Sequence, residues 1–268
     1  MTPSAAPLLL GVLNTTPDSF SDGGLHQAPD AAVAHGLALV AAGADVVDVG
    51  GESTRPGATP VDPEEEARRV LPVVRGLVAA GVRVSIDTRR ASVAAAALAA
   101  GATIVNDVEG GAGDPDMLAV VAGSQADYVV MHSRGQAAAD GGYGDVVADV
   151  VTDLELRVAA AEAAGVPAHR LVVDPGIGFA KTADESWALL RSLDVLAAAF
   201  PDTRLLVGAS RKRFLGAVLP EGATAVERDL PTAVLSALVG DRVWGLRVHD
   251  VAATRAALAV AARMRGAA

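Results

Sequence analysis

The chain has 268 residues, a formal net charge of −10 and no cysteine. The lack of cysteine excludes disulfides, thiolate nucleophiles and cysteine-ligated metals. Its basic residues form no long run, so the basic stripe that a nucleic-acid surface needs is missing and we expect no nucleic-acid partner. A length near the ~250 residues of one α/β barrel leads us to expect one domain over residues 1–268.

The apolar composition predicts a large core and no membrane span. Hydrophobic residues make up 51% of the chain and aromatic residues 3%, so the core must be built mainly from Ala, Val and Leu. Asp, Gly or Arg interrupts every apolar run before it reaches the ~20 residues that a span requires. The first seven residues lack the basic start and apolar stretch of a signal peptide. We therefore expect a cytoplasmic protein.

One pattern repeats along the chain: a short run rich in Val, Ile and Leu ends in polar residues, and an Ala/Leu-rich stretch follows. Such runs are typical of buried strands, and the stretches between them predict helices. Two of these helices, Ala31–Ala42 and Ser92–Ala100, each end at a glycine, and Pro63 opens another with three glutamates in its first turn. The predicted strands are Leu8–Asn14, Asp45–Gly51, Arg83–Thr88, Thr103–Val108, Tyr128–Ser133, Leu171–Gly178, Arg204–Arg211 and Trp244–Asp250.

Eight strands that alternate with helices predict a parallel sheet covered by helices, and eight strands close a barrel. A doubly wound sheet would have fewer strands and a glycine-rich turn after the first one, whereas this strand ends in Asn14-Thr-Thr-Pro. We therefore predict the α/β class, as a single-domain (β/α)8 TIM barrel. The segment Gln136–Gly144 is interpreted as a loop and not as a domain boundary.

Polar residues stand at the end of every predicted strand. In this fold the C-terminal strand ends form the active site. Any one of these residues could cap a turn or form a local salt bridge, but eight such ends at one mouth indicate a site. In chain order they are Asn14; Glu52 to Arg55; Asp87 and Arg89; Asn106 and Asp107; His132 and Arg134; Asp174; Ser210 to Lys212; and Arg247, His249 and Asp250.

These residues indicate a substrate that is both nitrogen-rich and anionic. Carboxylate, amide and ammonium groups suit a flat heterocycle with alternating donors and acceptors; they are Asp87, Asn106, Asp174 and Lys212. Cationic groups suit phosphates or a carboxylate; they are Arg55, Arg211, Arg247 and His249. The neutral oxygen of Asn14 is suited to Mg²⁺ held mainly by phosphate oxygens and water.

Seven motifs, in order, resemble those of dihydropteroate synthases, and the likeness extends from Leu8 to Val260. The first two are GVLNTTPDSFSDGG from Gly11 and VGGESTRPG from Val49. The others are SIDT from Ser85, VNDV from Val105, DPGIGF from Asp174, GASRKRF from Gly208 and RVHD from Arg247. The resemblance implies a transferase of folate biosynthesis, a sulfonamide target that joins 6-hydroxymethyl-7,8-dihydropterin diphosphate to p-aminobenzoate.

The resemblance also implies roles for single residues. The pterin edge would be bound by Asp87, Asn106, Asp174 and Lys212, with Met131 packed on the ring or simply part of the core. The diphosphate and its Mg²⁺ would be held by Asn14, Arg247 and His249. Two loops would close over the site, one with Thr54, Arg55 and Pro56 and one with Thr16, Pro17 and Phe20. The p-aminobenzoate pocket would be shaped by Phe179, Ser210 and Lys212, with a helix N-terminus after Ser210 to receive the carboxylate.

The family mechanism fits this set of residues. Departure of diphosphate builds negative charge that Mg²⁺, Arg247 and His249 would stabilise, while Asp87 would offset positive charge on the pterin. The arylamine needs no strong base, so phosphate contact is favoured for His249 over general-base catalysis. The sequence departs from the family at Thr15, Glu109 and Ala180, and in the stretch from Ser133 to Gly144. These departures concern loop packing.

Two alternatives remain open. A methyltetrahydrofolate methyltransferase domain shares the pterin-binding Asp and Asn positions but lacks the Thr54-Arg55-Pro56 loop and the Ser210-Arg211-Lys212 run. A pterin-binding paralogue without synthase activity would keep the fold and the contact residues. The family is usually homodimeric, and the apolar faces of Thr232–Val239 and Ala253–Met264 are the surfaces we expect to be involved.

Overall fold

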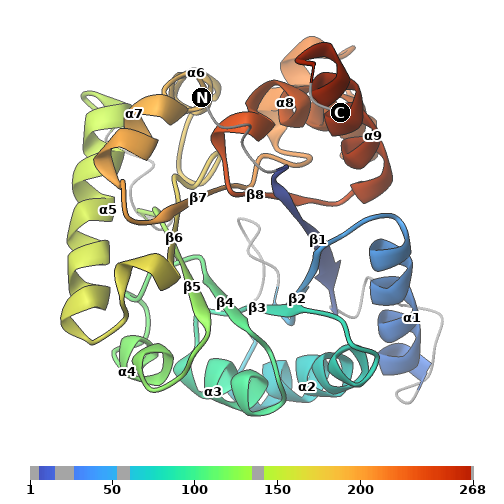
Figure 1. The fold of residues 1–268 in the computed structure, drawn as a ribbon, viewed down its shortest axis with the longest axis vertical. Helices are drawn as coiled ribbons and strands as arrows, with labels where there is room; N and C mark the ends of the chain where they lie inside the picture. Colours follow the sequence, from blue (N-terminus) through green and yellow to red (C-terminus); the bar gives the residue numbers. More distant parts are fainter. Residues whose placement is uncertain (1–5, 16–26, 53–60, 135–141, 267–268) are drawn as a thin grey trace.

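The computed structural model describes residues 6–15, 27–52, 61–134 and 142–266. Within these ranges the strands form a closed parallel barrel in chain order, in which β8 pairs with β1 (Figure 1). The predicted (β/α)8 barrel is therefore confirmed. The strands are β1 Leu8–Asn14, β2 Val46–Gly50, β3 Val84–Asp87, β4 Ile104–Asp107, β5 Asp127–Met131, β6 Leu171–Asp174, β7 Arg204–Val207 and β8 Gly245–Val248.

The α-helices lie outside the ring of strands (Figure 1). They are α1 Gln27–Ala41, α2 Pro63–Ala79, α3 Ala91–Ala99, α4 Met117–Ala122, α5 Val146–Ala163, α6 Ala183–Arg191, α7 Leu193–Ala199, α8 Asp229–Val239 and α9 Val251–Met264. Local chemistry sets several starts: Asp62 caps α2 by accepting from Glu65 N at 2.8 Å, and Thr182 with Glu185 forms a capping box at α6. Among the described residues, no helix is both long and apolar enough to cross a membrane.

Alternation along the strands produces two separate cores. Side chains that point outward pack against the helices in one large cluster that includes Leu9, Val47 and Ile86. Side chains that point inward form a second cluster, here called the apolar layer, which fills the N-terminal half of the barrel. It consists of Leu10, Val46, Ile104, Val129, Val172 and Leu206, all with no exposed surface. The barrel is thus closed below the strand ends.

Most predicted strands extend past the observed ones at their C-terminal ends. The prediction ran β6 to Gly178, whereas it ends at Asp174; Pro175 follows, and Gly176 has a left-handed φ of +64°. Similarly, β7 was predicted to reach Arg211 but ends at Val207, and Arg211 itself is left-handed with φ +59°. The chain leaves the sheet at these points, so the polar residues that follow lie on turns above the barrel.

Candidate active site

Four strand-end residues lie side by side in adjacent strands. The register of the parallel pairs places Asn14 of β1 beside Gly50 of β2, Gly50 beside Asp87 of β3, and Asp87 beside Asn106 of β4. Register partners in a parallel sheet point to the same face, so the three side chains face the barrel interior together. The sequence prediction that they share one site is consistent with this placement.

A buried carboxylate one step deeper connects these groups. Asp48, two residues before Gly50, has no exposed surface. Its Oδ2 accepts from Arg247 Nε at 2.5 Å and from Asn106 Nδ2 at 3.2 Å, and Arg247 also donates from its NH2 group to Asp87 Oδ2 at 2.6 Å. We call Asp48, Asp87, Asn106, Asp174 and Arg247 the polar layer. It lies on the C-terminal side of the apolar layer.

Charge in the polar layer is held at a high desolvation cost. Burial raises the pKa of Asp87 to about 7, although the Arg247 cation opposes that shift and Asp48 adds to it. The pKa of Arg247 is raised as well, because the attraction of Asp48 and Asp87 outweighs its burial. Asp48 Oδ1 has no hydrogen-bond partner among the described residues. The layer therefore contains one buried carboxylate oxygen that the described residues leave without a hydrogen bond.

Two glycines leave room between these charged groups. A Cβ atom on Gly50 would lie 3.6 Å from both Asn14 Oδ1 and Asp87 Oδ2, and one on Gly208 would lie 3.5 Å from Asp174 Oδ2. The Gly208 position also faces Arg247, whose Cβ would be 3.9 Å away. Any larger residue at these positions would project a side chain among the polar groups.

The turn after β6 brings Asp174, Phe179 and Lys212 together. Asp174 Oδ1 accepts from Gly176 N at 2.8 Å, and burial raises the Asp174 pKa against the attraction of Lys212 and Lys181. The ammonium of Lys212 lies 3.6 Å from the centre of the Phe179 ring, a cation–π contact. Burial lowers the pKa of Lys212 to about 7, with Asp174 opposing the shift. A carboxylate and an ammonium thus face the same space.

The three residues of the run Ser210-Arg211-Lys212 have different contacts, and those of Lys212 are given above. Ser210 Oγ lies 2.9 Å from His249 Nδ1 and accepts from His249 N at 3.1 Å, which joins β7 to β8. Arg211, expected among the anion-binding cations, instead forms a two-pronged pair with Asp229 at 2.7 Å for both contacts. A helix N-terminus was expected after Ser210, and the first helical segment that follows is a short 3-10 helix over Arg213–Val218.

Other polar strand ends have structural partners. Asp107, next to Asn106, accepts from Tyr128 OH at 2.8 Å and from Gly111 N at 2.7 Å, and Asp250 caps α9 through Ala253 N. Arg134 lies over the Tyr143 ring at 4.1 Å. For Asp107 and Asp250 the turn-capping interpretation therefore applies.

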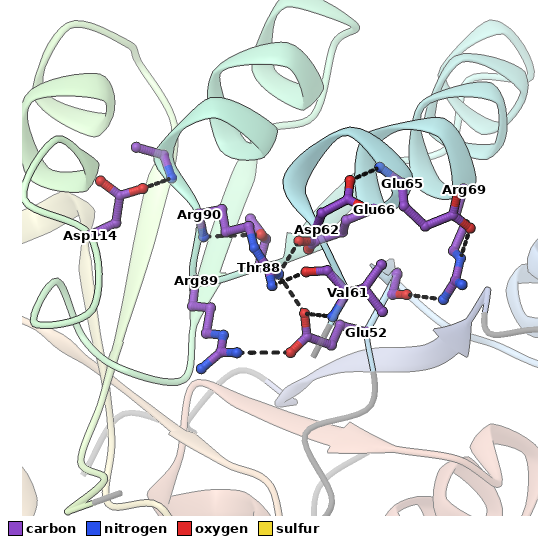
Figure 2. A network of polar contacts seen from close by, with 12 residues as sticks. Glu52, Val61, Asp62, Glu65, Glu66, Arg69, Thr88, Arg89, Arg90 and Asp114 are labelled. Atoms are coloured by element: carbon purple, nitrogen blue, oxygen red, sulfur yellow. Dashed lines mark hydrogen bonds and ion pairs between the residues drawn. The ribbon is translucent and has the colours of Figure 1, made fainter. Parts of the chain in front are cut away.

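A network of acids and arginines lies where β2 and β3 lead into their helices (Figure 2). Arg90 forms ion pairs with Glu52, at 2.5 Å, and with Glu66, and its guanidinium also donates to the carbonyl of Val61. Arg89 bridges Glu52 and Glu109 at 2.9 Å each. Glu52 and Val61, which flank residues 53–60, are thus held by one guanidinium. Glu109, one of the positions at which the sequence departs from the family, therefore has an ion-pair partner in this network.

The remaining expected site residues are placed in part. Met131 is 3% exposed at the end of β5 and is the register partner of Asp174, a position compatible with ring packing and with a plain core role. Residues of both expected closing loops lie outside the described ranges, as does most of Gln136–Gly144; the loop residues are Thr16, Pro17, Phe20, Thr54, Arg55 and Pro56. Of the sixteen residues expected in the site and its closing loops, the structure thus describes ten.

Sequence reasoning missed three contributors. Asp48 could have been noticed as a carboxylate inside an apolar strand, Val46-Val-Asp-Val-Gly50, whose alternation points it inward. No sequence pattern marks the open space beside Gly208, because its importance depends on the side chains that surround it in the fold. Lys181 donates to three groups beside the site, and its position depends on the path of the β6–α6 turn.

Comparisons with known proteins agree with the chemistry of these groups. Residues 10–249 match the family model described as pterin binding enzyme. A dihydropteroate synthase of Mycobacterium leprae is 53% identical over 267 residues, 96% of this chain and 93% of that protein. Solved structures of the Xanthomonas albilineans dihydropteroate synthase are similar too. One with 4-aminobenzoic acid has a TM-score of 0.91 and 44% identity, covering 98% of this chain and 94% of that one. One with 7,8-dihydropteroate has a TM-score of 0.88 and 41% identity, covering 98% and 95%.

Proposed function

The chain belongs to the family of pterin-binding enzymes, and from this premise we propose that it acts as a dihydropteroate synthase. This transferase of folate biosynthesis joins 6-hydroxymethyl-7,8-dihydropterin diphosphate to p-aminobenzoate and releases 7,8-dihydropteroate and diphosphate. The observation that carries the proposal is the polar layer, in which carboxylates, an amide and a guanidinium meet above a closed apolar layer. Likeness to synthases along nearly the whole chain supports the same activity.

Each group in the site has a part in substrate binding. The pterin edge is held by the two carboxylates Asp87 and Asp174, the amide of Asn106 and the ammonium of Lys212, because these alternate acceptors with donors. Met131 packs on the ring. The arylamine lies near Phe179 and Ser210, and the Thr54-Arg55-Pro56 loop completes the site. Sulfonamides, which mimic p-aminobenzoate, compete for that position.

The reaction exchanges one bond for another at the pterin methylene carbon. The C–O bond to diphosphate breaks and its electron pair leaves with the diphosphate. The arylamine lone pair forms the new C–N bond, and the amine then loses a proton to solvent. Arg247 and His249 stabilise the charge on the leaving group, and Asp87 offsets positive charge on the pterin. The Ser210 hydroxyl beside His249 Nδ1 fixes the ring of that histidine.

Mg²⁺ is part of the proposal, with Asn14 as its protein ligand. Among the described residues no group of three or more His, Asp or Glu side chains could hold a metal ion, and Asp87 is engaged by Arg247. The donor set therefore fits a cation that is bound mainly by phosphate oxygens and water rather than by a protein cage. Such an ion would neutralise charge on the diphosphate.

The test is diphosphate release from the pterin diphosphate with Mg²⁺, measured with and without p-aminobenzoate. Release that depends on p-aminobenzoate, with 7,8-dihydropteroate formed in equal amount, is the expected result. Pterin binding without release would instead favour the paralogue or the methyltransferase domain. The control is the same assay without Mg²⁺, in which release should fall sharply.

We further propose a homodimer in the cytoplasm. The side chains of Leu230, Val234 and Leu238 are exposed at four-residue spacing along α8, and Met264 on the neighbouring α9 is 83% exposed. With the exposed Val260 of α9, five apolar side chains on one helix pair fit a partner surface of the same kind. Light scattering at micromolar concentration should give twice the mass of the 268-residue chain, and Leu238→Glu should shift it toward the monomer. A wild-type monomer would contradict the dimer.

A further inference from the structure

Lysine is rare in this chain and confined to one place. Of the 22 Lys and Arg residues only two are lysines, Lys181 and Lys212. Both lie at the C-terminal end of the barrel, and Lys212 already has a role in the proposed site. Lys181, on the turn between β6 and α6, is not among the residues that the resemblance assigns. Arginine serves as the cation everywhere else, so the compact ammonium at Lys181 needs its own explanation.

The Lys181 ammonium connects two strand ends. Its Nζ lies 2.9 Å from His132 Nδ1, which follows β5, and donates to the carbonyl oxygens of Gly176 at 3.0 Å and Phe179 at 3.2 Å, which follow β6. Three contacts match the three hydrogens of an ammonium. His132 has no exposed surface, and burial with the nearby Lys181 charge lowers its pKa to about 3. A neutral imidazole therefore accepts the hydrogen bond.

The turn that Lys181 holds is conformationally unfavourable. Gly176 is left-handed, and a Cβ atom there would lie 2.0 Å from the carbonyl oxygen of His132. Ala180, which stands where the family commonly has glycine, is also left-handed with φ +46°. A non-glycine residue adopts this conformation only at a cost in free energy, because its Cβ crowds the neighbouring carbonyl oxygen. The turn therefore depends on further contacts, and the Lys181 ammonium supplies two hydrogen bonds to it and a third to His132.

Two groups of the site depend on this turn. Gly176 accepts from Lys181 through its oxygen and donates to Asp174 Oδ1 through its nitrogen, at 2.8 Å. Phe179 accepts from Lys181 through its oxygen, and its ring lies under the Lys212 ammonium. One ammonium thus fixes the backbone that sets both the Asp174 carboxylate and the Phe179 ring.

We infer that Lys181 is a positioning residue: its ammonium ties the Asp174–Phe179 turn to His132 and so sets the pterin-binding carboxylate and the p-aminobenzoate-facing ring together. This inference rests on the proposed function for the names of the two substrates. Its charge also acts on both neighbours, since it lowers the pKa of Asp174 against burial and contributes to the lowered pKa of Lys212. Around Lys181 itself stand Asp174, Glu185 and Asp153, with Arg134 as the nearby cation.

The test compares Lys181→Met, which keeps length and removes the ammonium, with Lys181→Arg, which keeps the charge. Lys181→Met should lower kcat/KM roughly 100-fold, the cost of a misplacement of about 1 Å, with KM raised for both substrates. Lys181→Arg should recover a part of the loss. Arg213→Met, which removes an exposed cation next to Lys212, should stay within twofold of wild type. Unchanged KM and kcat in Lys181→Met would overturn the inference.

A second measurement does not depend on turnover, and its first part uses only the wild type. Lysine labelled with ¹³C at Cε gives one signal for each of the two lysines. In the wild type, the Lys181 signal should titrate well below 10.5, because burial lowers its pKa to about 7. In Lys181→Met the pKa of Lys212 should rise, because a neighbouring positive charge is gone. Two wild-type signals that both titrate near 10.5 would overturn the inference even if synthase activity is confirmed.

If the wild type releases no diphosphate, the proposed function fails, and the inference is then decided by pterin binding. Calorimetry with 6-hydroxymethylpterin should show weaker binding to Lys181→Met than to the wild type and to Arg213→Met. Equal binding to all three proteins would overturn it.

Discussion

Asp48→Asn tests whether one buried carboxylate organises the polar layer. Oδ2 of Asp48 accepts from Arg247 at 2.5 Å and from Asn106 at 3.2 Å. An asparagine of the same shape can still accept both bonds through its oxygen, so the change removes charge and leaves geometry intact. Hydrogen bonds to charged groups contribute ~1.5–3 kcal/mol and neutral ones ~0.5–1.5 kcal/mol. Because the guanidinium keeps its charge, only the bond to Asn106 becomes a neutral one, and the variant should lose about 1 kcal/mol of unfolding free energy.

Asp48→Ala should cost more, because it leaves the guanidinium of Arg247 with one carboxylate. Breaking a buried pair costs ~3–5 kcal/mol, and since Asp87 still holds Arg247 the value should fall near the lower end, about 3 kcal/mol. For a chain of this size each kcal/mol shifts Tm by ~2–4 °C. Asp48→Asn should thus melt roughly 2–4 °C below the wild type, and Asp48→Ala further below it.

Urea denaturation of Asp48→Asn, Arg247→Met and the double variant measures the coupling between the two side chains. We expect a coupling of about 1–2 kcal/mol, together with a fall in kcat/KM. Ser85→Ala is the matched control: Ser85 is the register partner of Asp48, and its buried Oγ has no hydrogen-bond partner among the described residues. Loss of this hydroxyl should leave the unfolding free energy unchanged or raise it. A coupling near zero, with Asp48→Asn as stable as Ser85→Ala, would refute the reasoning.

Four further predictions follow from the same contacts. Lys212→Ala and Asp87→Ala should each lower turnover by at least ~100-fold, with little change in Tm for Lys212→Ala and a loss of about 3 kcal/mol for Asp87→Ala, which like Asp48→Ala leaves Arg247 with one carboxylate; a large loss of stability with normal specific activity would make these residues part of the scaffold. Gly208→Ala should raise KM for the pterin diphosphate while Tm stays within a few degrees, because the added Cβ meets Asp174 Oδ2 at an ordinary 3.5 Å; unchanged KM would mean that the gap is not used. Ala180→Gly should add about 1 kcal/mol to the unfolding free energy in urea by relieving the left-handed alanine, and a destabilised variant would contradict that strain. Lys212→Met should flatten the pH dependence of stability: the folded pKa is lowered from 10.5 to about 7, so the unfolded chain binds more protons between these values and stability rises with pH there. Urea denaturation at pH 7 and pH 9 measures the unfolding free energy of both proteins. If that free energy changes equally with pH in the variant and the wild type, the result would count against a lowered Lys212 pKa.

The barrel could be predicted from the sequence because its inward and outward faces are both apolar over most of each strand. Runs such as Leu171-Val-Val and Arg204-Leu-Leu-Val are continuous and β-branched or leucine-rich, and each begins where the structure places it. The C-terminal limits were less predictable. There the polar residues that end a strand and those that form the following turn are alike in composition, and only backbone conformation, as at Arg211 with φ +59°, separates them.

The site was predictable residue by residue where a strand delivers the side chain, and not where a turn does. Asp87 and Asn106 follow from alternation and register, whereas the direction of Arg211 depends on its left-handed backbone, which turns the guanidinium toward Asp229. For Lys181 the sequence shows only that lysine is rare in this chain. Its three partners come from His132 and from a turn with a left-handed alanine, and no local pattern predicts that approach.

The two layers inside the barrel explain how a costly site coexists with a stable fold. Desolvation raises the pKa of Asp87 and lowers that of Lys212, so each charged group in the polar layer opposes folding unless a partner compensates it. The apolar layer and the strand–helix core contain none of these groups. Because the closed ring of hydrogen-bonded strands fixes the positions of Asp87, Asn106 and Arg247, the charges are held at close range before any substrate arrives. A pterin that hydrogen-bonds to Asp87 and Asp174 would then add partners to carboxylates whose burial raises their pKa in the protein alone.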